Sequence, residues 1–295
     1  MPEIVHPVAE LIKEYAIMTL LQKTYGKDRV RVMRVDRSRE RHEVRELTVR
    51  AMVTGRFDDA FTRADNSTSV ATDTVKNIVN IVAHENIAAG IEDFCAAVAR
   101  KLLDLYSAVD SATVTAHETK WSRLSLNGTP HQHSFLLDSN GRPFAKVVAT
   151  RNDLKTESGV SAFTFMKSTQ SGWEHYIHDR YTTIPETHDR IVATAMDASW
   201  RWNSVPADYA AANANVLTTL LEVFATTYSS SVQDSLYRMG MAALEAVPEV
   251  ADISMACPNK HYLLINFAPF EMDNPNQVFV ATDEPHGQIE CTVGR

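Results

Sequence analysis

The chain contains few cysteines, and their positions suggest no covalent scaffold. Three cysteines occur among 295 residues, and no C-x-x-C spacing relates Cys95, Cys257 and Cys291. An odd number of widely separated thiols argues against a disulfide framework and against a cysteine-based zinc site, and it suits a reducing compartment.

Long apolar runs and an excess of basic residues are lacking as well. No apolar run approaches the ~20 residues that a membrane-spanning helix needs. The N-terminus carries Glu3, Glu10 and Glu14 where a secretory signal would be basic. The formal net charge of −8 disfavours a nucleic-acid partner, because affinity for phosphate backbones comes mainly from clustered Lys and Arg. The one basic run, residues 29–41, is interpreted as the solvated face of a strand. We therefore expect a soluble cytoplasmic protein without membrane or nucleic-acid partners.

Apolar periodicity divides the chain into an N-terminal segment and two similar halves. With 44% hydrophobic residues, the chain is long enough for two cores. Residues 1–24 carry apolar residues at helical spacing and predict an N-terminal helical extension. In residues 25–150, two alternating runs predict a long antiparallel hairpin around Val30 and Val49. Helical periods around Val79 and Leu102 follow, and then strand-like runs at 112–126, 133–137 and 142–150.

The second half, residues 151–295, repeats this order. Strands are predicted at 159–167 and 190–202, and helices around Leu220 and Leu236. Closing strands are predicted around Met255 and at 277–281 and 288–293. The periodicity therefore predicts an α+β protein in which a ββααββ unit is written twice.

A dense polar stretch separates two apolar runs of the second half. Residues 167–190 read K-S-T-Q-S-G-W-E-H-Y-I-H-D-R-Y-T-T-I-P-E-T-H-D-R, with the aromatic Trp173 ahead of a polar run closed by Arg190. Polar loops between regular elements are where sites are built. The order K-S-T, an aromatic residue, D-x-Y-T-T and E-T-x-D-R resembles the signature of the urate oxidase (uricase) family.

Further segments resemble the same family and occur in its order. They cover nearly everything from Tyr25 to Arg295 and read Y-G-K-D-R-V-R-V around Lys27, A-D-N-S and V-A-T-D-T-V-K-N around Thr72, W-S-R-L-S-L-N-G-T-P-H-Q-H-S-F, S-S-V-Q, P-N-K-H and the final C-T-V-G-R. The resemblance implies two tandem tunnelling-fold (T-fold) domains, residues 25–150 and 151–295. It also implies a homotetramer in which antiparallel sheets join into a barrel around a central tunnel, with active sites at subunit interfaces.

The resemblance also implies how a substrate would be held. Urate is a flat purine anion, so its site needs an aromatic face and a fork of donors. The family's clamp on the ring edge maps to Arg190 and Gln233, with the backbone N–H of Val232 adding a donor. Trp173 stands where most members of the family carry phenylalanine, and indole also stacks on planar rings.

Each of these residues also has an interpretation without function. An isolated Arg190 would be interpreted as a surface ion-pair partner of Asp189 or Glu186, and an isolated Trp173 as a core residue. The match in the surrounding residues favours the functional interpretation.

The family's proton relay maps to Lys27, Thr72 and His261. A lysine, a hydroxyl and an imidazole can pass a proton along a chain, provided that desolvation or nearby positive charge lowers the lysine pKa. Asn259 is carried over as the amide that holds dioxygen together with Thr72. The resemblance implies that Lys27, Thr72 and Asp73 come from one subunit and the remaining residues from its neighbour. Taken singly, Lys27 would be interpreted as a turn residue and Thr72 as a helix cap.

The reaction that the resemblance implies is oxidation of urate by dioxygen to 5-hydroxyisourate and hydrogen peroxide, without metal or flavin. Three alternatives stay open. One is a metal-dependent hydrolase that uses the H-x-H pair His131/His133 or the pair His175/His178, although no acidic or cysteine ligand accompanies them at a recognised spacing. The others are a T-fold enzyme that acts on pterins and a non-catalytic homologue. The chain ends at Gly294-Arg295 and lacks the S-K-L peroxisomal address, which favours the cytoplasm.

Overall fold

The structure is a computed structural model that describes residues 19–86 and 88–295. The N-terminal helical extension was predicted for residues 1–24. Residues 1–18 lie outside the described part, and residues 19–24 belong to no helix or strand, so the prediction is wrong for those six residues. The first half contains β1 (Tyr25–Asp36), β2 (Glu43–Gly55), α2 (Asp58–Thr62), α3 (Thr72–Glu85), α4 (Ile91–Leu105), β3 (Val109–Leu126), β4 (Thr129–Asp138) and β5 (Arg142–Thr150). The second contains β6 (Leu154–Lys167), β7 (Val192–Trp202), α5 (Tyr209–Thr226), α6 (Val232–Ala246), β8 (Val250–Leu264), η1 (Ala268–Phe270) and β9 (Phe279–Gly294).

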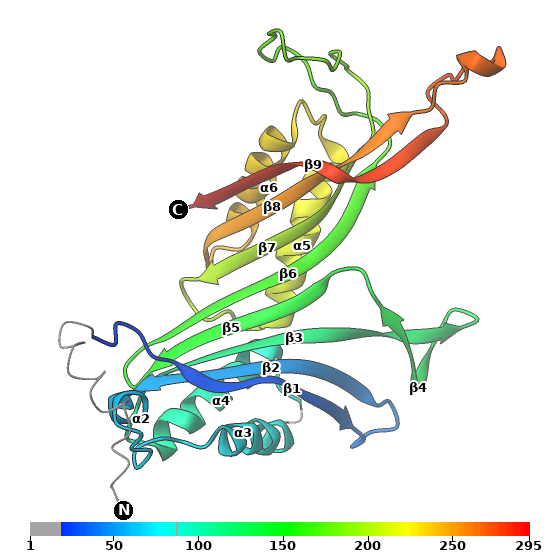
Figure 1. Cartoon of the computed structure of the whole chain (residues 1–295). Coiled ribbons are helices and arrows are strands. Elements are labelled where there is room, and N and C mark those ends of the chain that lie inside the picture. The colour runs from blue at the N-terminus through cyan, green and yellow to red at the C-terminus, as the bar shows by residue number, and fades with distance from the viewer. Residues whose placement is uncertain (1–18, 87) are drawn as a thin grey trace, which may run out of the picture.

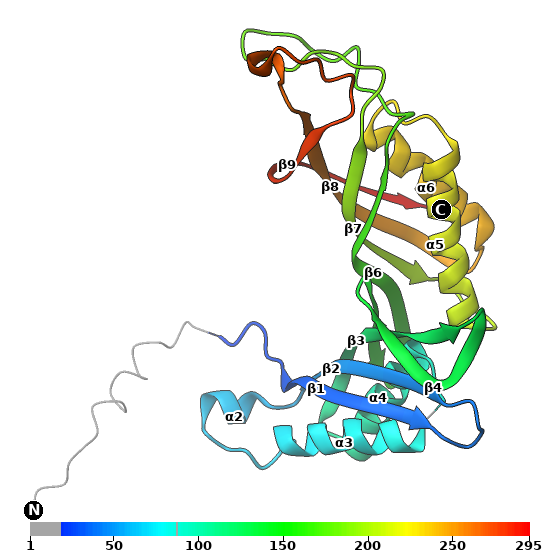
Figure 2. The ribbon, with the colours of Figure 1, turned by 90° about the vertical axis from the view of Figure 1, so that its right-hand side faces the viewer.

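All of these strands join one antiparallel sheet. Its order is β1-β2-β3-β5-β6-β7-β8-β9, and β4 lies off this path as a hairpin partner of β3. Without β4 and the five-residue α2, each half reads as two strands, a helix pair and two strands, so the predicted ββααββ repeat is confirmed. Figures 1 and 2 show that the sheet is strongly curved and that both helix pairs cover its outer face. Strands β1 and β9 form its two edges.

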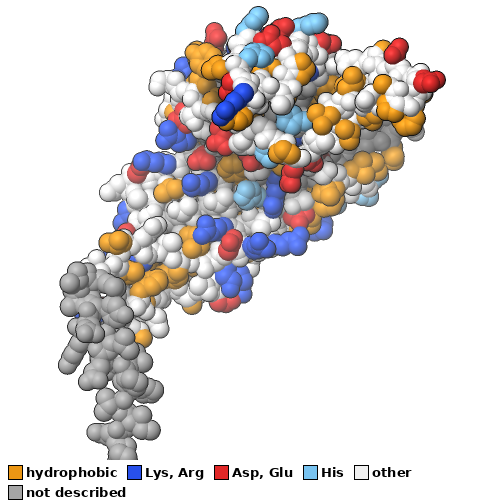
Figure 3. Space-filling model, turned by 45° about the horizontal axis from the view of Figure 1, so that its top comes forward, with side chains coloured by type: hydrophobic (Ala, Val, Ile, Leu, Met, Phe, Trp, Pro, Cys, Tyr) orange, Lys and Arg blue, Asp and Glu red, His pale blue; other side chains and the backbone are white. Residues whose placement is uncertain are grey.

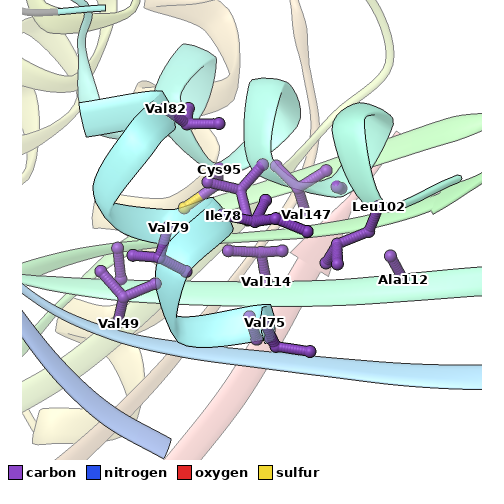
Figure 4. Close-up of a cluster of buried hydrophobic side chains, with 14 of the residues drawn as sticks. Val49, Val75, Ile78, Val79, Val82, Cys95, Leu102, Ala112, Val114 and Val147 are labelled. Carbon is purple, nitrogen blue, oxygen red and sulfur yellow. The ribbon is translucent and has the colours of Figure 1, made fainter. Parts of the chain in front are cut away.

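Each helix pair covers its own hydrophobic cluster. The first cluster joins β1, β2, β3 and β5 to α3 and α4, and Figure 4 shows Val79, Cys95 and Leu102 meeting Val114 of the sheet. The second joins β6 to β9 to α5 and α6. The clusters draw on residues 30–149 and 160–293. The domain boundary near residue 150 stays a prediction, because β5 and β6 pair across it.

A buried polar network ties the two halves together. Glu92 of α4 is only 4% exposed, and its Oε1 accepts hydrogen bonds from the Ser158 hydroxyl (2.6 Å) and the Asn213 amide (2.8 Å). The indole N–H of Trp202 donates to Ser158, and that of Trp200 donates to Asn213 (both 2.9 Å). Buried polar groups need such partners, so the network specifies how α4 meets α5 and β6.

Two sequence predictions about the strands are wrong in part. Residues 279–281 and 288–293 of the two predicted runs belong to one strand, β9, whose register shifts where residues 283–286 bulge opposite β8. Residues 277–278 precede this strand. The polar residues of the bulge, together with Pro285 and Gly287, interrupt the apolar alternation in the sequence. Pairing with β8 nevertheless continues on both sides of the bulge, so the two runs form one strand. The basic run is also not wholly solvated, because Arg34 is only 2% exposed. Even-numbered positions of β1 face the helices, and the Arg34 guanidinium lies over the Phe94 ring.

The three cysteine thiols are free, and two of them are core residues. Burial raises the pKa of the Cys95 thiol far above its usual range, and it raises that of Cys257 to about 12. Such thiols stay protonated and behave as small hydrophobic groups. In the described residues, no helix is long and apolar enough to cross a membrane.

Candidate active site

The polar stretch forms the loop between β6 and β7, and backbone hydrogen bonds hold it against the start of α6. The Gly172 N–H donates to the Ser229 carbonyl (2.8 Å), and the Ser229 N–H donates to that of Gln170 (3.0 Å). The Arg190 N–H donates to the Ser171 carbonyl (2.9 Å), so both ends of the loop meet at one place. A Cβ at Gly172 would lie 2.2 Å from the Tyr228 hydroxyl oxygen and 3.0 Å from the Thr187 carbonyl oxygen, so a larger residue here would displace the Tyr228 side chain. The fold therefore brings Arg190 beside the residues that lead into α6.

The first turn of α6 presents the two residues predicted to contact a ligand edge. Val232 and Gln233 open the helix, and Gln233 is exposed. Ser231 caps the helix, since its hydroxyl accepts the Asp234 N–H at 3.1 Å. The first N–H groups of a helix have no intrahelical acceptor, so the Val232 N–H is suited to bind an acceptor on a ligand.

Arg190 is partly buried, but neither Asp189 nor Glu186 forms an ion pair with its guanidinium. Its Nε is buried without a hydrogen-bond partner among the described residues. Asp189 instead accepts from the Thr169 hydroxyl (2.7 Å), and Glu186 is bonded to His178 (3.1 Å). The surface ion-pair interpretation is therefore wrong. Burial lowers the pKa of the Arg190 guanidinium, which nevertheless stays charged at neutral pH, and a buried unpaired donor is costly unless a ligand uses it.

Trp173 lies near the start of the same loop, where it pairs with Thr187 near the loop's end. Its backbone N–H donates to the Thr187 carbonyl (2.6 Å) and its carbonyl accepts the Thr187 N–H (3.0 Å). The indole is partly exposed and belongs to neither hydrophobic cluster, so the core interpretation is wrong. It stacks on Tyr176, with ring centroids 5.3 Å apart and planes inclined by 12°.

A second group of predicted residues gathers at the start of β1 and α3. Lys27 lies in β1, immediately before a register shift, and is not a turn residue. Thr72 is the first residue of α3 and does not cap it, because Ala71 holds the cap position. Lys76, Asn77 and the more distant charge of Lys27 lower the pKa of the Asp73 carboxyl, with the Lys76 hydrogen bond as the largest cause.

A surface cavity of about 470 Å³ adjoins this group. Tyr25, Phe61, Val70 and Thr72 are among its lining residues. The Val70 N–H donates to the Tyr25 hydroxyl at 2.7 Å, which ties β1 to the segment that leads into α3. Thr72 therefore lies at the edge of a largely apolar cavity.

Asn259 and His261 lie on β8 where its pairing with β9 is irregular. Asn259 pairs with Gly287 and His261 with Thr282, so four residues of β9 bulge opposite Lys260. On the other side, Lys260 pairs with Ala193, three residues after Arg190. The register therefore brings Asn259 and His261 to the same end of the sheet as the polar loop.

One chain does not bring all the predicted site residues together. The loop, the start of α6 and the irregular part of β8 form one group, and Lys27, Thr72 and Asp73 form the other. Figures 1 and 2 show α3 at one end of the molecule and the loop after β6 at the opposite end. A site that uses both groups needs a second chain.

The histidine pairs are not assembled as metal ligands. His131 and His133 pack edge to face with centroids 4.7 Å apart, and His178 is bonded to Glu186. In residues 19–86 and 88–295, no group of three His, Cys, Asp or Glu side chains is placed to hold a metal ion. The described residues therefore do not supply the ligand set that a metal-dependent hydrolase needs.

Some residues that position the site were not singled out in the sequence. The Tyr228 hydroxyl donates to the His188 carbonyl (2.9 Å) and so holds the end of the loop. The Lys167 ammonium donates to the carbonyls of Phe224 (3.2 Å) and Thr227 (2.8 Å), which anchors the loop start to the end of α5. Lys167 ends a predicted strand and opens the K-S-T motif, but neither pattern indicates that its ammonium anchors the loop. Tyr228 lies two positions before the S-S-V-Q segment and belongs to no quoted motif.

Two ββααββ units in one antiparallel sheet, with helices outside and polar site residues at both ends, define a protein of the tunnelling fold. The sequence model described as uricase matches residues 23–148 and 156–290. The chain is 37% identical to a uricase of Arthrobacter globiformis, over 94% of this chain and 90% of that protein. It is 35% identical to a uricase of Dictyostelium discoideum, over 94% and 98%. The chain belongs to the uricase family.

Solved structures agree with this assignment. The crystal structure of the Arthrobacter globiformis uricase superposes with a TM-score of 0.89 at 37% identity, covering 94% of this chain and 95% of that one. A urate oxidase of Bacillus sp. TB-90 superposes with a TM-score of 0.79 at 23% identity, covering 93% and 100%, and supports the fold.

Proposed function

We propose that this chain oxidises urate with dioxygen and forms 5-hydroxyisourate and hydrogen peroxide, without a metal or flavin cofactor. Membership of the uricase family supports urate as the substrate and favours it over a pterin. The observation that carries the proposal is the partly buried Arg190, whose Nε has no partner in the described residues and which lies beside the start of α6. A charged donor fork held in this way suits an anionic heterocycle.

The reaction balances with water as a third reactant. Urate loses two electrons and two protons, and dioxygen gains them to become hydrogen peroxide. Water then adds to the oxidised purine: its hydroxyl group bonds to C5 and its remaining proton goes to a ring nitrogen, so both of its hydrogen atoms stay in the product. Dioxygen accepts electrons from a deprotonated urate more readily than from the neutral purine. The contribution of the protein is therefore deprotonation, positioning and a polar place for dioxygen.

The substrate ring would be held by one group of residues. Arg190 and the Gln233 amide grip the ring edge, and the Val232 N–H at the start of α6 adds a third donor. The indole of Trp173 covers one face of the ring. The loop-to-helix hydrogen bonds support this arrangement, because they keep Arg190 and α6 in register.

Proton transfer would use the other group together with β8. Lys27, Thr72 and His261 form the relay, Asn259 and Thr72 hold dioxygen above the ring, and Asp73 borders the ligand. The shared surroundings of Lys27 and Asp73 support the first part of this assignment, since the charge of Lys27 contributes to the lowered pKa of the Asp73 carboxyl.

Both groups meet only if chains assemble, and we propose a homotetramer with active sites between subunits. The position of α3 and the loop at opposite ends of one chain supports this (Figure 1). The unpaired edges β1 and β9 offer backbone groups through which sheets could join into a barrel. Figure 3 shows hydrophobic side chains on the surface of the protruding β8–β9 hairpin. Leu263, Phe270 and Val280 of this segment are exposed. Such a patch is typical of an interface.

A direct assay tests the proposal. Protein treated with a chelator and dialysed should consume urate in air, and its absorbance should fall while peroxide appears in an equimolar amount. Loss of activity after chelation that an added metal ion restores would contradict a metal-free reaction. Consumption of urate without peroxide would contradict dioxygen as the two-electron acceptor.

A further inference from the structure

A stack of three aromatic rings lies in the loop between β6 and β7, and Trp173 is its first member. The rings of Trp173 and Tyr176 have centroids 5.3 Å apart and planes inclined by 12°. The rings of Tyr176 and His178 follow at 4.5 Å and 18°. Because these rings are nearly parallel, Tyr176 covers one face of the indole. A flat ligand is left with the opposite face.

The stack is anchored at both ends to the same returning segment of the loop. At one end, Trp173 and Thr187 exchange two backbone hydrogen bonds (2.6 and 3.0 Å). At the other, His178 Nε2 lies 3.1 Å from Glu186 Oε1, which also accepts the His175 N–H at 2.9 Å. The orientation of the first ring is therefore tied to residues 186–187.

The middle ring is held separately. The Tyr176 hydroxyl donates to the Ile184 carbonyl at 2.7 Å. Between Trp173 and Tyr176 the chain turns at His175, whose φ is 61°. This left-handed conformation is uncommon outside glycine, although histidine adopts it more often than most residues. The turn allows rings three positions apart to share one axis.

Packing of a hydrophobic core does not account for the stack. None of the three rings belongs to the hydrophobic cluster of the second half. The side chains of His178 and Glu186 are 54% and 37% exposed. Loops with few buried apolar contacts open easily, so a ring at such a site needs its own support to keep one orientation.

We propose that Tyr176 is a positioning residue that holds the indole of Trp173 in the orientation on which the substrate ring stacks, with His178 and Glu186 supporting Tyr176 from behind. This rests on the proposed function, because the ligand of the free indole face is the urate ring. Tyr176 does not touch the substrate and acts through Trp173.

Three variants test this in the full-length protein. Tyr176→Leu removes the stack, and KM for urate should rise about 2- to 12-fold, the range expected for one aromatic pair, while kcat changes little. Tyr176→Phe keeps the ring and loses only the bond to Ile184, so it should restore KM. Tyr181→Leu is the matched control, since Tyr181 is exposed in the same loop and contacts Arg180. It should leave KM unchanged.

A second measurement needs no turnover. The difference in fluorescence between the protein and its Trp173→Phe variant isolates the signal of this indole from the other tryptophans. Acrylamide should quench that signal more strongly when Tyr176 is replaced by Leu, and to the original extent when it is replaced by Phe. His178→Ala should raise quenching as well, and it decides the question if Tyr176→Leu does not fold.

Two outcomes would overturn the proposal. The first is unchanged quenching together with an unchanged KM in Tyr176→Leu. The second is a lower KM in that variant, which would mean that Tyr176 blocks the ligand face. A wild-type protein that does not oxidise urate refutes the proposed function instead, and the quenching series still decides whether Tyr176 holds the indole.

Discussion

Arg190 is the residue whose surroundings are hardest to explain without a ligand. Its guanidinium is partly buried, its Nε has no partner in the described chain, and the two nearest acidic residues in sequence bond elsewhere. Lysine would keep the positive charge at this position but not the planar fork. A lysine substitution therefore separates the contribution of the positive charge of Arg190 from that of its planar pair of donors.

Arg190→Lys should raise KM for urate about 10- to 100-fold, because a charge-assisted hydrogen bond to a ligand is worth ~1.5–3 kcal/mol. Steady-state kinetics over a wide urate range measure this. Arg180→Lys is the control, because Arg180 lies in the same loop and its guanidinium is bonded to the exposed Tyr181. Equal KM values for the two variants would remove Arg190 from the clamp.

Lys27 belongs to the opposite end of the chain and has a different expected effect. Lys27→Met should lower kcat about 10²- to 10⁴-fold, the usual contribution of one acid–base group, and change KM little. Lys155→Met, which alters an exposed lysine paired with Asp153, should leave kcat as it is. Turnover that survives Lys27→Met would exclude Lys27 from the proton relay.

At the residue scale, the sequence motifs nominate members of the candidate site but not their contacts. Trp173, Arg190 and Gln233 were nominated through the resemblance that the motifs carry, and their roles stay a prediction. The ring stack behind Trp173 was not predicted, because it depends on a left-handed conformation at His175 that no residue pattern marks. The burial of Arg34 was likewise missed, since the charge of a residue says less about its direction than the alternation of the strand that carries it.

At the element scale, periodicity predicted the helices and strands that bury an apolar face. Helices α3 and α4 bury residues at helical spacing, so their pattern was visible in the sequence. Helix α2 has five residues and buries none of them, so it left no pattern to find. Strand β9 appeared as two strands because its polar bulge interrupts the alternation, although pairing with β8 continues on both sides.

The cap of α6 links helix stability to the site. Ser231→Ala removes the hydroxyl that accepts the Asp234 N–H, and the loss should be ~1 kcal/mol. The melting temperature in calorimetry should fall by about 2–4 °C. KM for urate should rise in the same variant, because the same turn presents Val232 and Gln233.

Ser230→Ala is the control for this helix end. Its hydroxyl bonds to the Asp234 side chain at 3.0 Å and not to a backbone N–H. Its effect on stability should stay within ~0.5 kcal/mol, as for most surface substitutions. A larger loss in this control than in Ser231→Ala would contradict the capping argument.

At the scale of the whole molecule, one sheet and the Glu92 network make the two halves a single unit. That unit holds its two groups of site residues apart, at opposite ends (Figure 2). The repeat could be predicted from periodicity because each half buries its own core. Periodicity does not predict the separation of the two groups, because it depends on the curvature of the sheet, which results from tertiary packing. The resemblance to the uricase family did imply it, since it assigns Lys27, Thr72 and Asp73 to one subunit and the remaining residues to its neighbour.

Mixed oligomers test whether two chains build each site. Lys27→Met and Arg190→Met chains should each be nearly inactive. When co-expressed in equal amounts they should recover about 25% of wild-type activity, because random assembly gives a quarter of the sites two intact groups. Lys27→Met mixed with Thr72→Ala should recover nothing, since both changes damage the same group and every chain carries one of them. Recovery in neither mixture would place the whole site within one chain, which the opposite positions of α3 and the loop after β6 argue against.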